Sequence, residues 1–242
     1  MRLKIINPNT MELMTQQIGD KVRQVVRPGT EWVAVNPPRG PLSIEGFYDH
    51  SIAAVQVLEE ILREKGNYDA YIIACFGDPG LEGAREITDV PVIGICEAAL
   101  HLACLLAPRF SILTVLPRVV VELEDLVAKY GLKDRLASVR AANLTVEETA
   151  QDPENVRRAL VQEGRKAVAE DRAEALLLGC AGMARLDEEM EKELNVPVID
   201  GVAAAVKLAE ILVDLGKKTS KVNSYKYPEK KEFKGMGDIF QP

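Results

Sequence analysis

The feature that most constrains the fold is an internal repeat. Its first copy is Tyr68–Cys75 followed by Val90–Ala103, and its second is Ala173–Cys180 followed by Val196–Ala209. Cys75 aligns with Cys180 at an offset of 105 positions, and the prolines of the two later segments align at an offset of 106. A shift that holds across strand, loop, strand and helix predicts two similar halves related by a pseudo-twofold axis.

Short apolar, β-rich runs alternate along the chain with segments of helical periodicity. The expected strands are Leu3–Asn7, Trp32–Asn36, Ala70–Cys75 and Val90–Ile95, then Phe110–Leu116, Ala137–Ala141, Ala175–Cys180 and Val196–Asp200. Alternation of strand and helix indicates parallel sheets whose faces are covered by helices. The fold class is therefore α/β, with two pseudosymmetric lobes, each a four-stranded parallel sheet flanked by helices, and an active-site cleft between them.

The repeat also suggests domain boundaries. Residues 1–107 form the first lobe and 108–216 the second, with the helix of 201–216 a candidate to pack on the first lobe. Residues 217–242 lose periodicity, so we expect an irregular tail whose lysines are solvated. Asp78-Pro79 and Asp152-Pro153 each look like an N-cap followed by the first residue of a helix.

Composition narrows the function. A net charge of −7 without a basic cluster before the tail argues against nucleic acid or an anionic membrane as a partner, so a small-molecule ligand is expected. The N-terminus lacks the pattern of a secretory signal, which predicts a cytoplasmic protein. Four cysteines without CxxC spacing and two histidines make a poor zinc set, so no metal is expected. We expect a homo-oligomer.

Cys75 and Cys180 fall at the carboxyl ends of strands, where ligands bind in open α/β sheets. Each precedes a small-residue turn that leads toward a helix, and amides there favour a negative sulfur, so we expect thiol pKa values lowered toward neutrality. One thiolate could remove a proton while the opposite thiol supplies one. Such a pair inverts a stereocentre. Cys96 and Cys104 lack this placement and are expected to pack in the core.

Substrate contacts are proposed from position. The candidates are Asn7, Ser43, Phe76, Gly77, Thr114, Arg118, Ala181 and Gly182. The four residues that follow the cysteines offer backbone amides to a sulfur or to a bound oxygen. Asn9 and Thr10 are equally well explained as helix caps. Glu97 is expected to cap a helix or face solvent, and His101 to pack against its neighbours.

Several motifs occur together in one order. They are INPNT, GPLSIEGFYD, ACFGDPGL, VPVIGICEAALH, LGCAGMA, VPVIDGVAAAVKLAE and TSK. In this the chain resembles the hydantoin racemases of the aspartate/glutamate racemase superfamily, from Arg2 to about Lys221. The resemblance implies a cofactor-independent racemase of 5-substituted hydantoins, with Cys75 and Cys180 matching the two acid/base cysteines of the family.

The residues after the cysteines bear on the substrate. The amino-acid racemases of the superfamily carry Asn-Thr and Thr-Glu there, whereas this chain has Phe76-Gly77 and Ala181-Gly182. The difference favours a neutral ring with amide edges over a zwitterion. Allantoin is a 5-ureidohydantoin, so allantoin racemase is an alternative. Two others are a cysteine-dependent isomerase of a small diacid and a two-lobed binding protein without catalytic activity.

Overall fold

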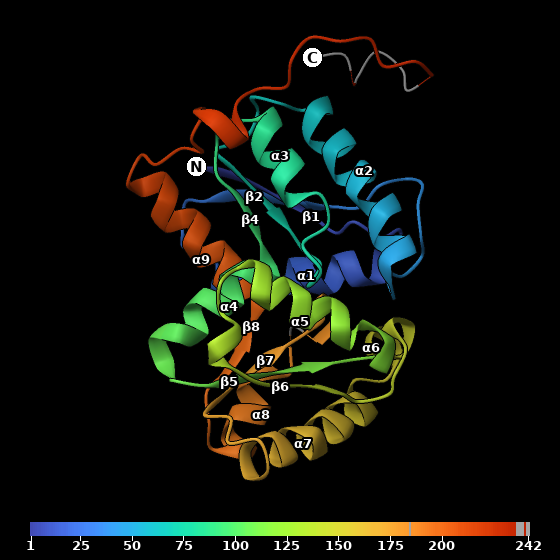
Figure 1. Cartoon of the computed structure of the whole chain (residues 1–242), viewed down its shortest axis with the longest axis vertical. Helices are drawn as coiled ribbons and strands as arrows, with labels where there is room; N and C mark the ends of the chain where they lie inside the picture. The colour runs from blue at the N-terminus through green and yellow to red at the C-terminus, as the bar shows by residue number, and fades with distance from the viewer. Residues whose placement is uncertain (184, 236–239, 241–242) are drawn as a thin grey trace.

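The computed structural model describes residues 1–183, 185–235 and 240, and it shows two α/β lobes stacked along the long axis (Figure 1). The strands are β1 Arg2–Ile6, β2 Glu31–Val35, β3 Ala70–Ile73, β4 Val92–Gly94, β5 Phe110–Thr114, β6 Leu136–Ala141, β7 Ala175–Leu178 and β8 Val198–Asp200. Each lobe holds one parallel sheet, with strand orders β2-β1-β3-β4 and β6-β5-β7-β8. The two orders are the same pattern repeated, which confirms the predicted fold class.

Helices cover both sheets. They are α1 Glu12–Val25, α2 Phe47–Arg63, α3 Leu81–Ile87, α4 Ile95–Leu106, α5 Val120–Lys129, α6 Val146–Gln151, α7 Pro153–Ala169, α8 Asp187–Leu194 and α9 Gly201–Asp214. Single 3-10 turns occur at η1 Pro117–Val119, η2 Lys133–Arg135, η3 Ala181–Met183 and η4 Asn223–Tyr225. In α1 the apolar residues Met14, Ile18 and Val22 recur at helical spacing and are buried against the core. Within the described residues, no helix is both long and apolar enough to span a membrane.

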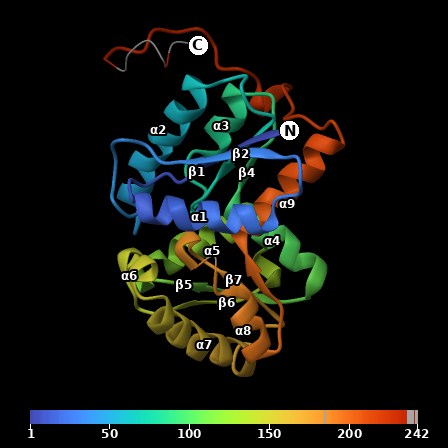
Figure 2. The ribbon, with the colours of Figure 1, turned by 180° about the vertical axis from the view of Figure 1, so that it is seen from behind.

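The helices α4 and α9 are exchanged between the lobes. α4 follows strand β4 of the first sheet, yet it packs on β7 and β8 of the second. α9 follows β8, yet it packs on β3 and β4 of the first sheet and on α1. α1 itself lies between the two sheets (Figure 2) and contacts η3 and α6 of the second lobe. The interface between the lobes is therefore built from helices of both.

Asp78 does not cap the helix that follows it, contrary to the sequence expectation. α3 begins three residues later, after Gly80 in the left-handed region at φ 75°. The Asp78 carboxylate instead accepts the backbone N–H groups of Cys96 and Glu97 at 3.0 and 2.9 Å, at the start of α4. The Tyr130 hydroxyl of the second lobe also donates to it, at 2.7 Å. The expectation for Asp152 is confirmed, because its side chain caps α7.

Space for the Asp78 carboxylate depends on Gly94. A Cβ atom at Gly94 would lie 2.2 Å from Cγ of Asp78, far inside van der Waals contact. In the repeat, Gly94 aligns with Asp200, whose own side chain caps α9 by accepting the N–H of Ala203 at 2.7 Å. Both exchanged helices thus begin at a buried carboxylate. For α4 it is Asp78, from the loop after β3, and for α9 it is Asp200, the N-cap of the helix itself.

The tail is fastened to the first lobe, and the expectation that its lysines are only solvated is wrong for two of them. Nζ of Lys221 donates to the carbonyls of Arg85 and Glu86 at 2.5 and 3.2 Å, near the end of α3. Lys218 forms an ion pair with Asp89 at 2.6 Å. Carbonyls at a helix C-terminus carry partial negative charge and lack helical partners, so a lysine there is stabilising. Part of the expected tail, residues 236–239 and 241–242, lies outside the described residues.

Candidate active site

Cys75 and Cys180 occupy equivalent turns. Each lies two residues beyond a central strand, β3 in one lobe and β7 in the other. The carbonyl of Cys75 accepts the N–H of Asp78 at 3.0 Å, and that of Cys180 accepts the N–H of Met183 at 3.1 Å. The two copies of the sequence repeat therefore adopt equivalent turns, and each turn places its cysteine at the carboxyl edge of its sheet.

Glycine two residues after each cysteine is required by close packing from other elements. A Cβ atom at Gly77 would lie 2.9 Å from Cδ2 of His50, and one at Gly182 would lie 2.6 Å from Oγ1 of Thr149. The N–H groups of these two glycines also hydrogen-bond to the sulfurs of Cys75 and Cys180, respectively. The expectation that backbone amides approach the thiols is met by these two residues.

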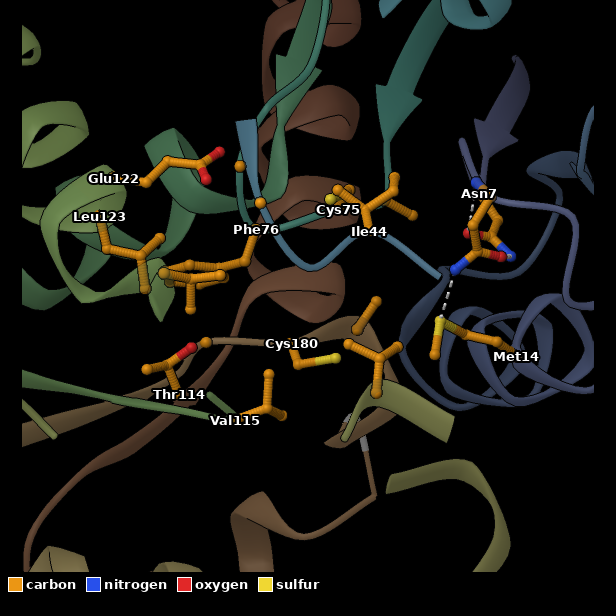
Figure 3. Close-up of a pocket in the computed structure, with 18 residues that line it drawn as sticks. Asn7, Met14, Ile44, Cys75, Phe76, Thr114, Val115, Glu122, Leu123 and Cys180 are labelled. Atoms are coloured by element: carbon orange, nitrogen blue, oxygen red, sulfur yellow. Dashed lines mark hydrogen bonds between the residues drawn. The ribbon is translucent and has the colours of Figure 1, made fainter. Parts of the chain in front are cut away.

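The two cysteines line one cavity from opposite sides, as Figure 3 shows. Its volume is about 60 Å³, room for about four to six water molecules and hence for a small ring. The first lobe contributes Asn7, Asn9, Met14, Ile44, Gly46 and Ala74 to Gly77; the second contributes Thr114, Val115, Val119, Glu122, Leu123, Val146 and Gly179 to Ala181. The walls are mainly apolar, with few polar groups.

Most of the predicted contact residues line this cavity. Asn7, Phe76, Gly77, Thr114 and Ala181 do so, together with the two cysteines. Three do not: Gly182 lies within the Cys180 turn and packs against Thr149, Ser43 precedes the lining residue Ile44, and Arg118 is exposed. The Arg118 guanidinium lies against Gly46, where a Cβ atom would be 2.9 Å from it, so this arginine covers the loop at the cavity rather than entering the cavity.

Asn7 and Thr114 differ in how far their polar groups are already used. The Asn7 amide nitrogen donates to Oδ1 of Asn9 at 2.8 Å and to Oγ1 of Thr15 at 3.0 Å, so it organises the turn before α1. Thr114 is 1% exposed, and its hydroxyl has no hydrogen-bond partner among the described residues. A buried hydroxyl without a partner is costly unless a ligand or water satisfies it. Thr114 is therefore the better placed of the two to bind substrate.

The comparisons with known proteins bear on this cavity. The family model described as Asp/Glu/Hydantoin racemase matches residues 3–209. The chain belongs to this family. It is 53% identical to a hydantoin racemase of Pseudomonas sp. (strain NS671), over 99% of this chain and 97% of the relative. It is 46% identical to a hydantoin racemase of Paenarthrobacter aurescens, over 96% of this chain and all of the relative.

A solved structure agrees with this assignment. The allantoin racemase from Klebsiella pneumoniae is 45% identical and superposes with a TM-score of 0.96, over 100% of this chain and 99% of that one. Membership of the racemase family makes the chain an enzyme of the isomerase class, which argues against a binding protein without catalytic activity.

The thiols of this racemase-family site are not acidified in the way the sequence suggested. Burial raises the pKa of Cys75 to about 12, and it raises the pKa of Cys180 as well. The glycine amides oppose this shift but are outweighed, because the lobes close around both sulfurs and desolvate the thiolates. The negative charges of Cys180, Asp78 and Glu122 raise the pKa of Cys75 further.

Sequence reasoning missed three groups around the cavity. Glu122 lines it, and burial raises the pKa of its carboxyl. Nε2 of His50 is 2.8 Å from the Gly77 carbonyl oxygen and 3.9 Å from Oε1 of Glu122. Thr149 contacts the Cys180 turn from α6. Nothing in the local pattern marks these residues, because each lies on an amphipathic helix that reaches the cavity only after the lobes assemble.

Glu97 and His101, both on α4, do not line the cavity. Glu97 forms an ion pair with Arg85. His101 is exposed, contrary to the expectation of a packed side chain, and its Nδ1 is 2.8 Å from the carbonyl oxygen of Glu97 in the preceding turn. Cys96, on the same helix, is buried, as expected for core packing.

Proposed function

We propose that this racemase inverts the C5 centre of 5-substituted hydantoins without a cofactor, with Cys75 and Cys180 as its two acid/base groups. The observation that carries the proposal is the placement of two equivalent thiols on opposite walls of one small cavity. Two groups in this arrangement can remove a proton from one face of a carbon and deliver another to the opposite face. The names of the relatives supply the substrate class.

The reaction follows from this geometry. One thiolate takes the C5 proton, which the adjacent ring carbonyl acidifies, and negative charge develops on that carbonyl oxygen. The thiol opposite then protonates C5 on its other face. Because the Gly77 and Gly182 amides are directed at the sulfurs, the Phe76 and Ala181 amides and the Thr114 hydroxyl remain as donors for the enolate oxygen. After one turnover the protonation states of the two sulfurs are exchanged.

A single enantiomer of 5-benzylhydantoin incubated with the protein in heavy water tests the proposal. We expect optical rotation to fall to zero while one deuterium per molecule enters C5. Rotation is followed by polarimetry and deuterium by mass spectrometry, with the spontaneous rates measured without enzyme. Binding of the hydantoin without loss of rotation would rule the proposal out.

Allantoin is the second candidate substrate, because the solved structure at 45% identity is an allantoin racemase. The apolar lining residues Ile44, Val119 and Leu123 favour an apolar C5 substituent over the ureido group of allantoin. Comparison of kcat/KM for 5-benzylhydantoin and allantoin under the same conditions decides between them. A cysteine-dependent diacid isomerase would instead form a covalent adduct, which mass spectrometry of quenched enzyme detects.

The raised thiol pKa values predict an alkaline pH dependence. The base must be a thiolate, and below the first apparent pKa of the pair its fraction falls about tenfold for each pH unit. Burial raises the pKa values of both thiols above their ordinary range. We therefore expect kcat/KM to rise from pH 7 to pH 9 and to fall again only when both sulfurs ionise. Initial rates by polarimetry at each pH, corrected for spontaneous racemisation, measure the profile. A kcat/KM that is flat or falling from pH 7 to pH 9 would contradict this assignment.

A further inference from the structure

The pseudosymmetry of the two cysteines is broken by Thr149. This residue lies on the short helix α6 and is 2% exposed. Its Oγ1 occupies the space in which a Cβ atom of Gly182 would be only 2.6 Å away, so the hydroxyl contacts the Cys180 turn directly. The same hydroxyl hydrogen-bonds to the sulfur of Cys180. Val146, one turn earlier on α6, lines the cavity.

A single hydroxyl proton has two acceptors here. Thr149 donates to the carbonyl oxygen of Val146 at 2.6 Å. While Cys180 is a thiol, its S–H can donate to the threonine oxygen, which has lone pairs to spare. A thiolate at Cys180 is a stronger acceptor than the thiol, and rotation of the hydroxyl about its C–O bond would direct its proton at the sulfur, where a hydrogen bond stabilises the charged form. No atom is transferred, because only the hydroxyl rotates.

Cys75 has different surroundings. Its thiolate receives the Gly77 amide, and the negative charges of Cys180, Asp78 and Glu122 oppose its ionisation. The place that Thr149 takes beside Gly182 is taken beside Gly77 by the His50 ring, whose Nε2 lies 2.8 Å from the Gly77 carbonyl oxygen. The ionisable groups that face Cys180 are Glu45, on the loop before α2, and Cys75 across the cavity. Desolvation acts on both sulfurs, so the hydroxyl on one side and the extra carboxylates on the other decide which thiol gives up its proton more readily.

We propose that Thr149 is a positioning residue that stabilises the Cys180 thiolate and makes Cys180 the first of the two thiols to ionise. The singly ionised enzyme then holds its negative charge on Cys180 and its proton on Cys75. It is ready for the enantiomer whose C5 hydrogen faces Cys180. The preference for one enantiomer rests on the proposed racemase function, whereas the order in which the two thiols ionise does not.

Alkylation of the free enzyme with iodoacetamide over a pH series tests the order. The thiolate attacks the methylene carbon and iodide leaves, so the rate at each cysteine follows its thiolate fraction. Both cysteine residues are partly exposed and line the same cavity, so a small reagent that enters the cavity can reach either sulfur. Mass spectrometry of peptides gives a separate pH midpoint for each. We expect the midpoint of Cys180 to lie below that of Cys75 in the unmodified chain.

Substitutions at Thr149 test the cause. Thr149→Val keeps the shape but removes the hydroxyl, and it should raise the Cys180 midpoint by about one pH unit, a tenfold loss of thiolate at a given pH. Thr149→Ser should restore it. The matched control is Thr114→Val, which removes a hydroxyl from the same cavity without touching Cys180 and should leave the Cys180 midpoint in place. The acid limb of the kcat/KM profile should move with the Cys180 midpoint.

The outcomes separate the two proposals. An unchanged Cys180 midpoint in Thr149→Val, or alkylation of Cys75 before Cys180 in the unmodified chain, overturns the inference whatever the enzyme's activity. The second measurement needs no variant, so misfolding of Thr149→Val would leave the inference testable. A protein that alkylates in the expected order but fails to racemise any hydantoin would retain the inference and refute the function.

Discussion

Cys75→Ser and Cys180→Ser are each expected to lower kcat/KM for racemisation by roughly 10²–10⁴-fold, the range of general acid–base catalysis. A serine hydroxyl is far less acidic than a thiol and cannot supply the base at accessible pH. Each variant keeps one sulfur, so it should still exchange the C5 hydrogen of one enantiomer with solvent deuterium. The two variants should prefer opposite enantiomers, because the thiols lie on opposite walls of the cavity.

Racemisation and exchange are read from the same samples, by polarimetry and by mass spectrometry in heavy water. Cys104→Ser is the matched control, since Cys104 lies on α4 away from the cavity and should keep near-normal activity. If either Cys75→Ser or Cys180→Ser racemised at a rate close to that of the unmodified enzyme, the two-thiol mechanism would be wrong.

Gly94→Ala is expected to lower the free energy of unfolding by about 2–4 kcal/mol, combining overpacking with the loss of buried hydrogen bonds. The new methyl group would displace the Asp78 carboxylate from the start of α4 and from the Tyr130 hydroxyl. Because Asp78 closes the Cys75 turn through its N–H, racemisation should fall too. Urea unfolding followed by circular dichroism measures the stability change.

The control for Gly94→Ala is Gly19→Ala in α1. There a Cβ atom would meet the Trp32 side chain at an ordinary 3.5 Å, and alanine in a helix interior should stabilise by about 0.5–1 kcal/mol. The double variant Gly94→Ala with Asp78→Ala removes the clash, so its loss should be smaller than the sum of the two single losses. A Gly94→Ala protein as stable as the unmodified one would show that the Asp78 carboxylate can adopt another position without loss of stability, and would contradict this prediction.

The architecture was accessible from sequence because it depends on signals that are local and repeated. Apolar runs mark each strand within a few residues, and the duplication by itself assigns Cys75 and Cys180 to equivalent strand ends. Parallel order then follows from the helices between strands. The strand pattern and the duplication together also predict the position of the cavity and most of its predicted lining residues.

What escaped prediction depends on contacts between distant elements. Asp78-Pro79 has the local pattern of a helix start, and only the fold shows that the carboxylate serves α4 instead. Lys4 in β1 would be placed at the surface from its charge, yet it is 2% exposed and paired with Glu60 in α2 and with Glu64, which follows that helix. The thiol pKa values were misjudged because amides near a sulfur can be anticipated from sequence, whereas its desolvation by the opposite lobe cannot.

The exchange of α4 and α9 means that neither half of the chain is a self-sufficient folding unit. Cut between residues 107 and 108, the first half would leave its own sheet without α9 and present α4 with nothing to cover. The second half would have the converse defect. The arrangement is like that of two subunits that exchange a helix, here within one chain. The lobes should therefore unfold together in one cooperative event, and the cavity between Cys75 and Cys180 is complete only when both lobes are folded.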